Sequence, residues 1–353
     1  MPKYFCIFTL IMVRQKRTTI YDIAERLNIA ASSVSRALNN SSKVNAATKA
    51  LILKTAAEMN YQQNAMASNL RKGSNPTIGV VVPRINQDFF SNIIAGIEDI
   101  TYKNGYNLII CQSNELHARE VDCVNALVNQ HVNCIIISVA AEPGSYEHLQ
   151  QVLDHQIRLI QFDRVIDELD TFKVINDNER ASFNAVSHLI KQGYKRIALL
   201  EGPQNLDIFR QRKEGYLSAL RKHGFPVLDE LMCENAWTKE LSASATKQLL
   251  GLAVPPDAIF ASTSDFSALG VLEVATNMGI MVPDQLGICG YSNEPFTEIT
   301  SPSITTIDQY SFSMGKTIAN LFFQEMGDSD QQIEPKVMSI KPKLITREST
   351  NKK

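Results

Sequence analysis

The hydrophobic positions of the chain follow two different periods. Between residues 19 and 59, apolar side chains recur at spacings of three and four, which is typical of short amphipathic helices. After Pro76, short apolar runs alternate with helical stretches, which is typical of parallel strands covered by helices on both faces. The chain is therefore predicted to form a small all-α head followed by a larger α/β region with doubly wound parallel sheets.

Three short helices are predicted in the head. The first follows Thr19, whose hydroxyl can cap it while Asp22 completes a capping box, and Asn28 tolerates the left-handed turn at its end. The second, residues 31–38, exposes short polar side chains and the guanidinium of Arg36, and such a face can enter the major groove of DNA. Other short helix pairs share this pattern, so these residues alone leave the function of the head open. The predicted inward positions are Ile20, Ile23, Ala24 and Leu27, then Val34, Ala37 and Leu38, and in residues 47–59 Leu51, Ile52, Ala56 and Met59.

The larger region repeats an alternation of strand and helix in two halves. Because ligands of such folds bind beyond the carboxyl ends of the strands, the cleft between the halves is the expected binding site. A helix over 313–325 and a strand near 336–340 return to the first half and complete it. The other predicted strands are 78–82, 107–110, 134–137, 196–200, 258–261 and 286–290, and the other predicted helices are 90–104, 120–130, 181–192, 212–223 and 267–278.

The net charge of -2 hides an asymmetry along the chain. Residues 14–75 contain ten Lys or Arg and three Asp or Glu, whereas residues 76–353 contain 24 basic and 34 acidic residues. Only the head is therefore expected to attract a polyanion such as DNA.

The sequence contains no recognisable catalytic, cofactor or metal motif. It has no glycine-rich phosphate loop, and its six histidines have no obvious carboxylate or serine partner. The six cysteines are scattered, which is typical of a reducing compartment. The apolar segment 4–13 is too short for a bilayer, and no small-residue cleavage site follows it. We expect a cytoplasmic protein that does not contact membranes, with an N-terminal extension over residues 1–18. Met12 is the expected working start, and an unstructured N-terminal tail is the alternative.

Three segments of the head resemble one known family. Residues 19–24 (TIYDIA), residues 34–39 (VSRALN), and Asn60-Tyr61 followed by Ala67-x-x-Leu70 are similar to the operator-binding head and hinge of the lactose and galactose repressor family, LacI/GalR. The similarity extends over nearly the whole chain. It implies a helix-turn-helix head and two lobes that resemble a periplasmic-binding-protein fold.

The resemblance also implies which residues contact DNA. Ala31, Ser32 and Arg36 take the positions that meet base edges, and Leu70 takes that of a wedge that enters the minor groove and bends the duplex. Ala30 departs from the family pattern because it cannot cap the recognition helix, and Ala31 offers no hydrogen bond to a base, which leaves the operator sequence open. The DNA-binding residues implied are Thr19, Tyr21, Ala31, Ser32, Ser33 and Arg36, with Ser35 and Asn39 near phosphates, and Asn64, Ala67 and Leu70 in the hinge.

Polar and aromatic residues that fall just after a strand or in a loop that leads to a helix form the expected effector site. Arg212 resembles the family arginine whose fork holds ligand oxygens, although an arginine in a surface ion pair is the alternative. Trp237 can stack on a sugar ring or fill the core, and the Phe89-Phe90 pair can likewise divide between core and cleft. Gly290-Tyr291-Ser292-Asn293 resembles a family Gly-Tyr-Asp-Asn segment, and its serine leaves one carboxylate fewer for ligand hydroxyls. The effector-binding residues expected are Asp88, Phe89, Phe90, Asp163, Arg212, Trp237, Asp265 and Ser292.

Together these patterns predict a homodimeric, ligand-responsive repressor of a carbohydrate-utilisation operon, with operator double-stranded DNA and a small polar effector such as a sugar as partners. No cofactor, metal or enzymatic activity is expected. One alternative to a repressor is a periplasmic-type sugar-binding protein, but such a protein is not expected to carry a basic helical head. Another is an enzyme with a regulatory head, which would need a catalytic pair that the sequence lacks. The expected domains are the extension 1–18, the helix-turn-helix domain 19–63, the hinge helix and linker 64–75, the effector and dimerisation domain 76–345 (N-lobe 76–175 and 309–345, C-lobe 176–308) and a tail 346–353.

Overall fold

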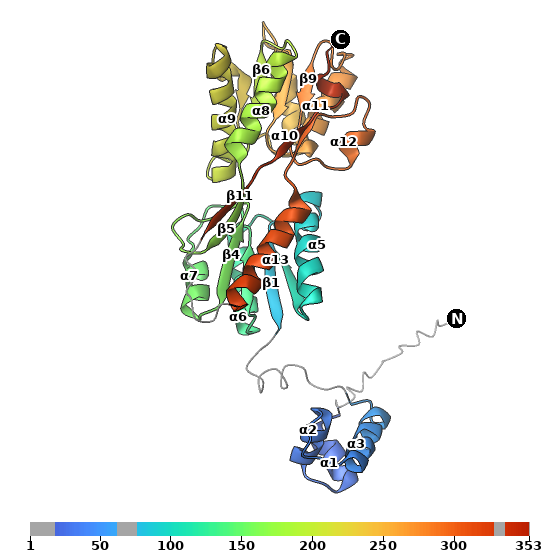
Figure 1. Cartoon of the computed structure of the whole chain (residues 1–353). Helices are drawn as coiled ribbons and strands as arrows, with labels where there is room; N and C mark the ends of the chain where they lie inside the picture. Colours follow the sequence, from blue (N-terminus) through green and yellow to red (C-terminus); the bar gives the residue numbers. More distant parts are fainter. Residues whose placement is uncertain (1–17, 62–75, 328–335, 353) are drawn as a thin grey trace, which may run out of the picture. The chain divides into compact units, whose positions relative to one another are not determined.

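The structure is a computed structural model that describes residues 18–61, 76–327 and 336–352 (Figure 1). The chain divides into two compact units, residues 1–74 and 75–353, and each is described by itself. The expected extension and hinge lie outside the described residues, apart from the last residue of the extension.

The first unit contains the three predicted helices, α1 (Ile20–Leu27), α2 (Ala31–Leu38) and α3 (Ala46–Glu58). The capping box of Thr19 and Asp22 is formed, and Asn28 adopts the left-handed conformation with φ 50°. One prediction for α3 is wrong, because Leu51 is 53% exposed while its neighbour Ile52 is fully buried. The buried face of α3 is formed by Ile52, Thr55 and Ala56, at spacings of three and four, and Leu51 lies outside it. The core of the unit is Ile23, Ala24, Val34, Ala37, Ile52 and Ala56.

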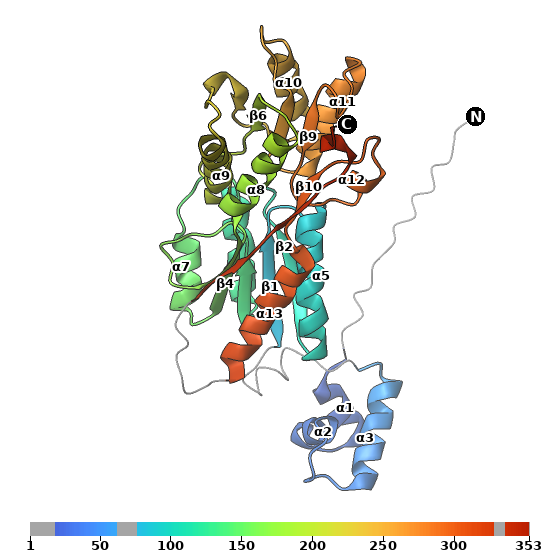
Figure 2. The ribbon, with the colours of Figure 1, turned by 45° about the horizontal axis from the view of Figure 1, so that its top comes forward.

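The second unit consists of two lobes, and the N-lobe is built on a six-stranded parallel sheet. Helices α5 (Asp88–Lys103) and α13 (Ser311–Gly327) pack side by side on one face (Figures 1 and 2). Helices α6 (His117–Asn129) and α7 (Glu147–Asp154) cover the other face. The strands in sheet order are β11 (Val337–Ile340), β5 (Phe172–Asn176), β4 (Arg158–Phe162), β3 (Cys134–Ile137), β1 (Thr77–Val82) and β2 (Asn107–Gln112).

The C-lobe repeats this architecture with a four-stranded parallel sheet. Helices α8 (Asn178–Lys191) and α9 (Asp207–His223) cover one face, and α10 (Lys239–Leu250) and α11 (Asp265–Asn277) cover the other. Two doubly wound lobes confirm the predicted fold class. The strands in sheet order are β7 (Met232–Cys233), β6 (Ile197–Leu200), β8 (Ala258–Ala261) and β9 (Gly287–Cys289), and the short helices of this lobe are η1 (Asp229–Leu231), α12 (Phe296–Ile299) and η2 (Glu348–Thr350).

The chain crosses between the lobes three times. It passes from β5 to α8, from β10 (Thr306–Asp308) to α13, and from β11 to β12 (Lys343–Ile345), and β10 pairs with β12 in antiparallel fashion. Side-chain packing assigns β12 to the C-lobe, because Leu344 contacts the C-lobe core. The N-lobe segment expected over 309–345 therefore ends near Ile340.

The last residues of the chain differ from the expected tail over 346–353. Ser349 and Thr350 are fully buried. The Ser349 hydroxyl donates to the carbonyl oxygen of Ile288 at 2.6 Å and accepts the backbone N–H of Thr305 at 2.8 Å. Arg347 donates to the carbonyl oxygen of Ile304 and to the Thr297 hydroxyl. These polar partners hold residues 347–350 in the C-lobe, a role that hydrophobic periodicity cannot indicate.

Candidate functional sites

Helix α2 presents the polar face that the sequence predicts. Val34 and Ala37 are buried in the head, while Ser32 and Arg36 on the opposite side are exposed. Ala30 makes no side-chain cap, as expected from its methyl group. A helix with this exposed face and this charge is suited to contact base edges in a major groove.

The other residues assigned to DNA differ in how free they are to contact it. Tyr21 is 71% exposed, whereas Thr19 is engaged in the capping box, where its hydroxyl donates to Asp22 at 2.6 Å. Asn39 at the end of α2 is exposed, and its amide donates to the carbonyl oxygen of Ser35 at 2.7 Å. Ala31, Ser33 and Ser35 are half-buried, and Asn64, Ala67 and Leu70 lie outside the described residues.

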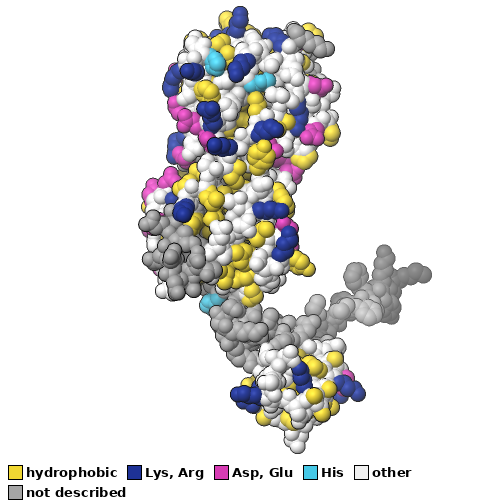
Figure 3. Space-filling view, viewed as in Figure 1, with side chains coloured by type: hydrophobic (Ala, Val, Ile, Leu, Met, Phe, Trp, Pro, Cys, Tyr) yellow, Lys and Arg dark blue, Asp and Glu magenta, His cyan; other side chains and the backbone are white. Residues whose placement is uncertain are grey.

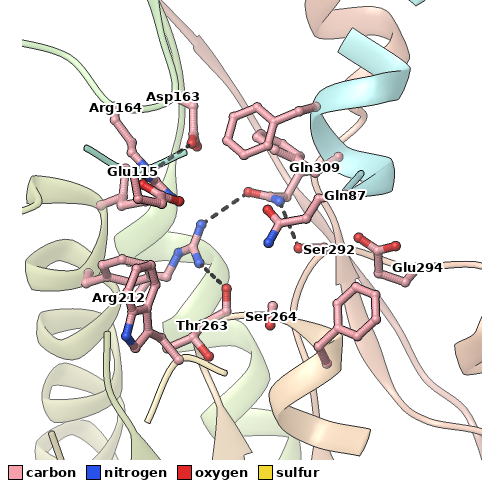
Figure 4. Close-up of a pocket in the computed structure, with 16 residues that line it drawn as sticks. Gln87, Glu115, Asp163, Arg164, Arg212, Thr263, Ser264, Ser292, Glu294 and Gln309 are labelled. Atoms are coloured by element: carbon pink, nitrogen blue, oxygen red, sulfur yellow. Dashed lines mark hydrogen bonds and ion pairs between the residues drawn. The ribbon is translucent and has the colours of Figure 1, made fainter. Parts of the chain in front are cut away.

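A cavity of about 60 Å³ lies between the two lobes, at the position expected for an effector (Figure 4). It lies beyond the carboxyl ends of the strands, where loops from both sheets meet. The cavity combines aromatic rings with paired charges and amides. Its lining residues are Gln87, Phe89, Phe90, Glu115, Asp163, Arg164, Ile208, Phe209, Arg212, Trp237, Thr263, Ser264, Phe266, Ser292, Glu294 and Gln309.

The structure brings most of the predicted effector residues to this cavity and separates two from it. The six that line it are Phe89, Phe90, Asp163, Arg212, Trp237 and Ser292. Asp88 instead lines a neighbouring cavity with Asn293 and Asp308. Asp265 is fully buried, and its carboxylate accepts the backbone N–H of Glu294 at 2.8 Å and the hydroxyl of Thr306 at 2.6 Å. Asp265 therefore holds two strand-end segments together.

Arg212 lies at the centre of the cavity wall and is 3% exposed. Helix α9 begins at Asp207, earlier than predicted, so Arg212 projects from within the helix. Its guanidinium donates to Asn178 Oδ1 at 2.9 Å, to the Ser262 carbonyl oxygen at 2.8 Å and to Gln309 Oε1 at 3.2 Å. It also stacks 3.7 Å from the ring centroid of Tyr291. These bonds exclude the alternative of a surface ion pair.

A buried ion pair at one end of the cavity was missed by the sequence analysis. Glu115 Oε2 accepts from Arg164 Nη1 at 2.6 Å. Beside them, Arg164 Nε and Asp163 Oδ1 have no hydrogen-bond partner among the described residues. A donor and an acceptor at one wall fit a ligand that carries both functions, such as a hydroxyl group. The available signal was the position of Glu115 just after a predicted strand.

Other missed lining residues come from segments that tertiary structure alone brings together. Phe209 and Phe266 add aromatic surface from α9 and α11. Gln309, at the second crossover, bonds Arg212 and donates to the Ser292 hydroxyl at 3.3 Å. Figure 4 shows that Gln309 spans the space between Arg212 and Ser292. Gln309 therefore takes one N–H of Arg212 inside the cavity.

Glu294 is a carboxyl group of the cavity wall whose acidity is changed by its surroundings. Burial, and then the carboxylates of Asp88 and Asp265, raise its pKa to about 7, although the backbone N–H groups of Asp88 and Phe89 partly offset this effect. Glu294 is 4% exposed. The group therefore changes charge near neutral pH at the edge of the cavity.

We expect Glu294→Gln to flatten the dependence of stability on pH. Because the folded-state pKa of about 7 lies above the ordinary value of 4.5, the stabilisation from protonated Glu294 is complete below pH 4.5 and is lost as the pH rises through 7. The variant should gain roughly 1 to 3 kcal/mol over the parent above pH 7. Urea unfolding between pH 5 and 8 measures this, with exposed Glu179→Gln as the control. If the free energy of unfolding depends on pH in the same way in Glu294→Gln and in the parent, the pKa of Glu294 is not raised.

Three further observations limit the chemistry of the chain. Among the described residues, no group of three or more His, Cys, Asp or Glu side chains is arranged to hold a metal ion. The cysteines in the described ranges are free thiols. No helix in the part of the chain that the structure describes is long and apolar enough to cross a membrane.

A helix-turn-helix module joined to a two-lobed ligand-binding domain defines the class of ligand-responsive transcription regulators. Residues 19–64 match the family of bacterial regulatory proteins, lacI family, and residues 186–350 match the periplasmic binding protein-like domain. The chain is 32% identical over 315 residues to the HTH-type transcriptional repressor CytR of Escherichia coli, covering 89% of this chain and 91% of that repressor. The chain belongs to the lacI family of regulators.

Solved structures agree with this assignment. The lac repressor dimer bound to operator and the anti-inducer ONPF superposes with a TM-score of 0.79 at 24% identity, covering 95% of this chain and 99% of that one. A lacI-family regulator from Enterococcus faecium with bound ribose gives a TM-score of 0.68 at 28% identity, covering 78% of this chain and 98% of that one. The protein is therefore a DNA-binding regulator rather than an enzyme, and a periplasmic-type binding protein is not favoured, because the head matches a family of regulators.

Proposed function

We propose that the chain is a homodimeric, cytoplasmic repressor of a carbohydrate-utilisation operon, and that its effector is a small polar compound of the sugar class. The observation that carries the effector assignment is the cavity between the lobes, where aromatic rings face the Asp163, Arg164 and Arg212 side chains. Rings suit the apolar faces of a sugar, and the charged groups suit its hydroxyls. The related regulator with bound ribose supports the same class.

The position of the cavity indicates how the effector acts. Its lining residues come from both lobes, and Gln309 already bonds Arg212 inside it. An effector that binds there contacts both lobes and competes with Gln309 for Arg212. If the effector binds one arrangement of the lobes more tightly than the other, it changes the affinity for the operator. The coupling free energy is typically about 1 to 3 kcal/mol.

A thermal-shift screen of monosaccharides and their derivatives against the full chain tests the effector class. At one hundred times its Kd, a true effector stabilises the folded protein by about 2.7 kcal/mol. The same compound should change operator affinity. The sugar class would be contradicted if no monosaccharide or derivative stabilised the protein while a compound without hydroxyl groups, added to the same screen, did.

The recognition helix provides a separate test of DNA binding. We expect Arg36→Ala to weaken binding to the operator by about 1 to 3 kcal/mol and to relax the preference at one base pair. Arg26→Ala, on α1 and in an exposed ion pair with Glu58, serves as the matched control. Both affinities are measured by fluorescence anisotropy on the operator and on single-base variants. If Arg36→Ala keeps the base preference of the parent at every operator position, Arg36 does not contact a base.

A further inference from the structure

A second cavity lies between the lobes and shares no lining residue with the one described above. Its volume is about 190 Å³. The N-lobe contributes the beginning of α6, residues 139–146 and the beginning of α7, and the C-lobe contributes Asn205 and Leu206. Next to it, the Asn205 side-chain amide donates to the carbonyl oxygen of Ala141 at 2.8 Å, which joins the two lobes. A small ligand in this cavity would contact both lobes.

Two histidines with fixed hydrogen bonds line the cavity. The His117 and His148 rings pack edge to face with centroids 5.3 Å apart. His117 Nε2 lies 2.7 Å from the carbonyl oxygen of Ser145, and His148 Nε2 lies 2.9 Å from Glu120 Oε1. Because these oxygens accept hydrogen bonds, each Nε2 donates, and in the neutral rings each Nδ1 is an acceptor. His148 is 5% exposed, and its Nδ1 has no hydrogen-bond partner within the described ranges.

The charge of the cavity favours a cationic ligand. Glu120 is buried in its wall, and Glu142 is exposed at its rim, where it accepts the backbone N–H of His117 at 2.7 Å. No Lys or Arg occurs among the described lining residues. The remaining wall is aliphatic and includes Val139, Leu149, Ile166 and Leu206.

We propose that this second cavity binds a small protonated aliphatic amine. The ammonium group lies beside the His148 ring and near the Glu142 carboxylate, and the alkyl chain packs on the aliphatic wall. Because such a ligand contacts both lobes, it favours the lobe arrangement seen here and acts on the same equilibrium as the effector. This site does not depend on which compound the first cavity binds.

The test uses pentylamine as the probe, with pentan-1-ol and pentanoate as compounds of equal chain length. Full-length protein carrying ¹³Cε1-labelled histidine is titrated at pH 7 and followed by NMR. We expect pentylamine to shift the His148 and His117 resonances with a Kd on the order of 1 mM, as is reasonable for a ligand of this size. The alcohol should bind more weakly, and pentanoate should give no shift. Equal binding of pentanoate, or no shift with the amine at 50 mM, about fifty times that Kd, overturns the proposal.

Two variants, each with a control variant, locate the binding site of the amine. His148→Gln should abolish the response, whereas His155→Gln, at the end of α7 and outside the cavity, should retain it. Because a substitution at buried His148 can unfold the lobe, the exposed variant Glu142→Gln provides a second test. It should weaken pentylamine binding by about fivefold. Glu147→Gln is its exposed control. The proposal is overturned if Glu142→Gln binds the amine as tightly as the parent.

Discussion

Replacement of Arg212 by alanine is expected to abolish the response to the effector and to lower the free energy of unfolding by about 2 to 4 kcal/mol. The first effect follows from its position in the cavity wall, where its planar fork can hold two ligand oxygens. The second follows from its bonds to Asn178, Ser262 and Gln309, because the buried oxygens of Ser262 and Gln309 would lose a donor and Asn178 Oδ1 would keep only the Tyr291 hydroxyl. A purely ligand-binding arginine would give the first effect alone.

Urea unfolding and operator affinity with and without effector separate these two effects. Arg210→Ala, exposed on the same helix in an ion pair with Asp207, is the matched control and should change stability by less than about 0.5 kcal/mol. Arg212→Lys keeps the charge but loses the fork, so it should retain more stability than alanine and still lose the response. A full effector response in Arg212→Ala would show that the arginine is structural only.

The sequence predicted a helix or strand well where its buried positions are marked by regularly spaced or continuous apolar residues. Helix α2 and strand β8 were predicted with their observed bounds. The helix buries the apolar positions Val34 and Ala37, and the apolar strand is buried along its whole length. Helix α10 was missed because its Ser, Thr and Ala residues form no strong apolar stripe, and tertiary contacts with α11 stabilise it instead. Strand β5 was missed because buried Lys173 interrupts its apolar run and donates to the carbonyl oxygen of Asp167.

The candidate site could be predicted only in part, for a physical reason. Asp163 lines the cavity because it directly follows β4, and the carboxyl ends of parallel strands meet at one edge. Its position after a strand is a signal that the sequence carries. It does not indicate where a side chain points, and Asp265 turns towards Thr306 and away from the cavity. Gln309 belongs to a crossover whose place beside Arg212 depends on the return of the chain to the N-lobe, which no local pattern reveals.

The affinity of the full chain for its operator is expected to fall by about 10³ to 10⁵ between 50 and 200 mM salt. One α2 helix covers only a half-site, so useful specificity requires two heads related by two-fold symmetry. Two heads, each from a segment of net charge +7 over residues 14–75, can together neutralise about 6 to 10 phosphates and release their counterions.

Anisotropy titrations over this salt range, combined with sedimentation at the same protein concentrations, measure the slope and the number of chains bound. Exposed Lys43→Ala in the head should reduce the slope by about 1 per chain if that lysine meets a phosphate, whereas exposed Lys222→Ala at the end of α9 should leave it unchanged. Binding by a single chain, or an affinity that changes less than about tenfold over the range, would contradict the dimeric model, because one head with few phosphate contacts releases too few ions for a steep dependence.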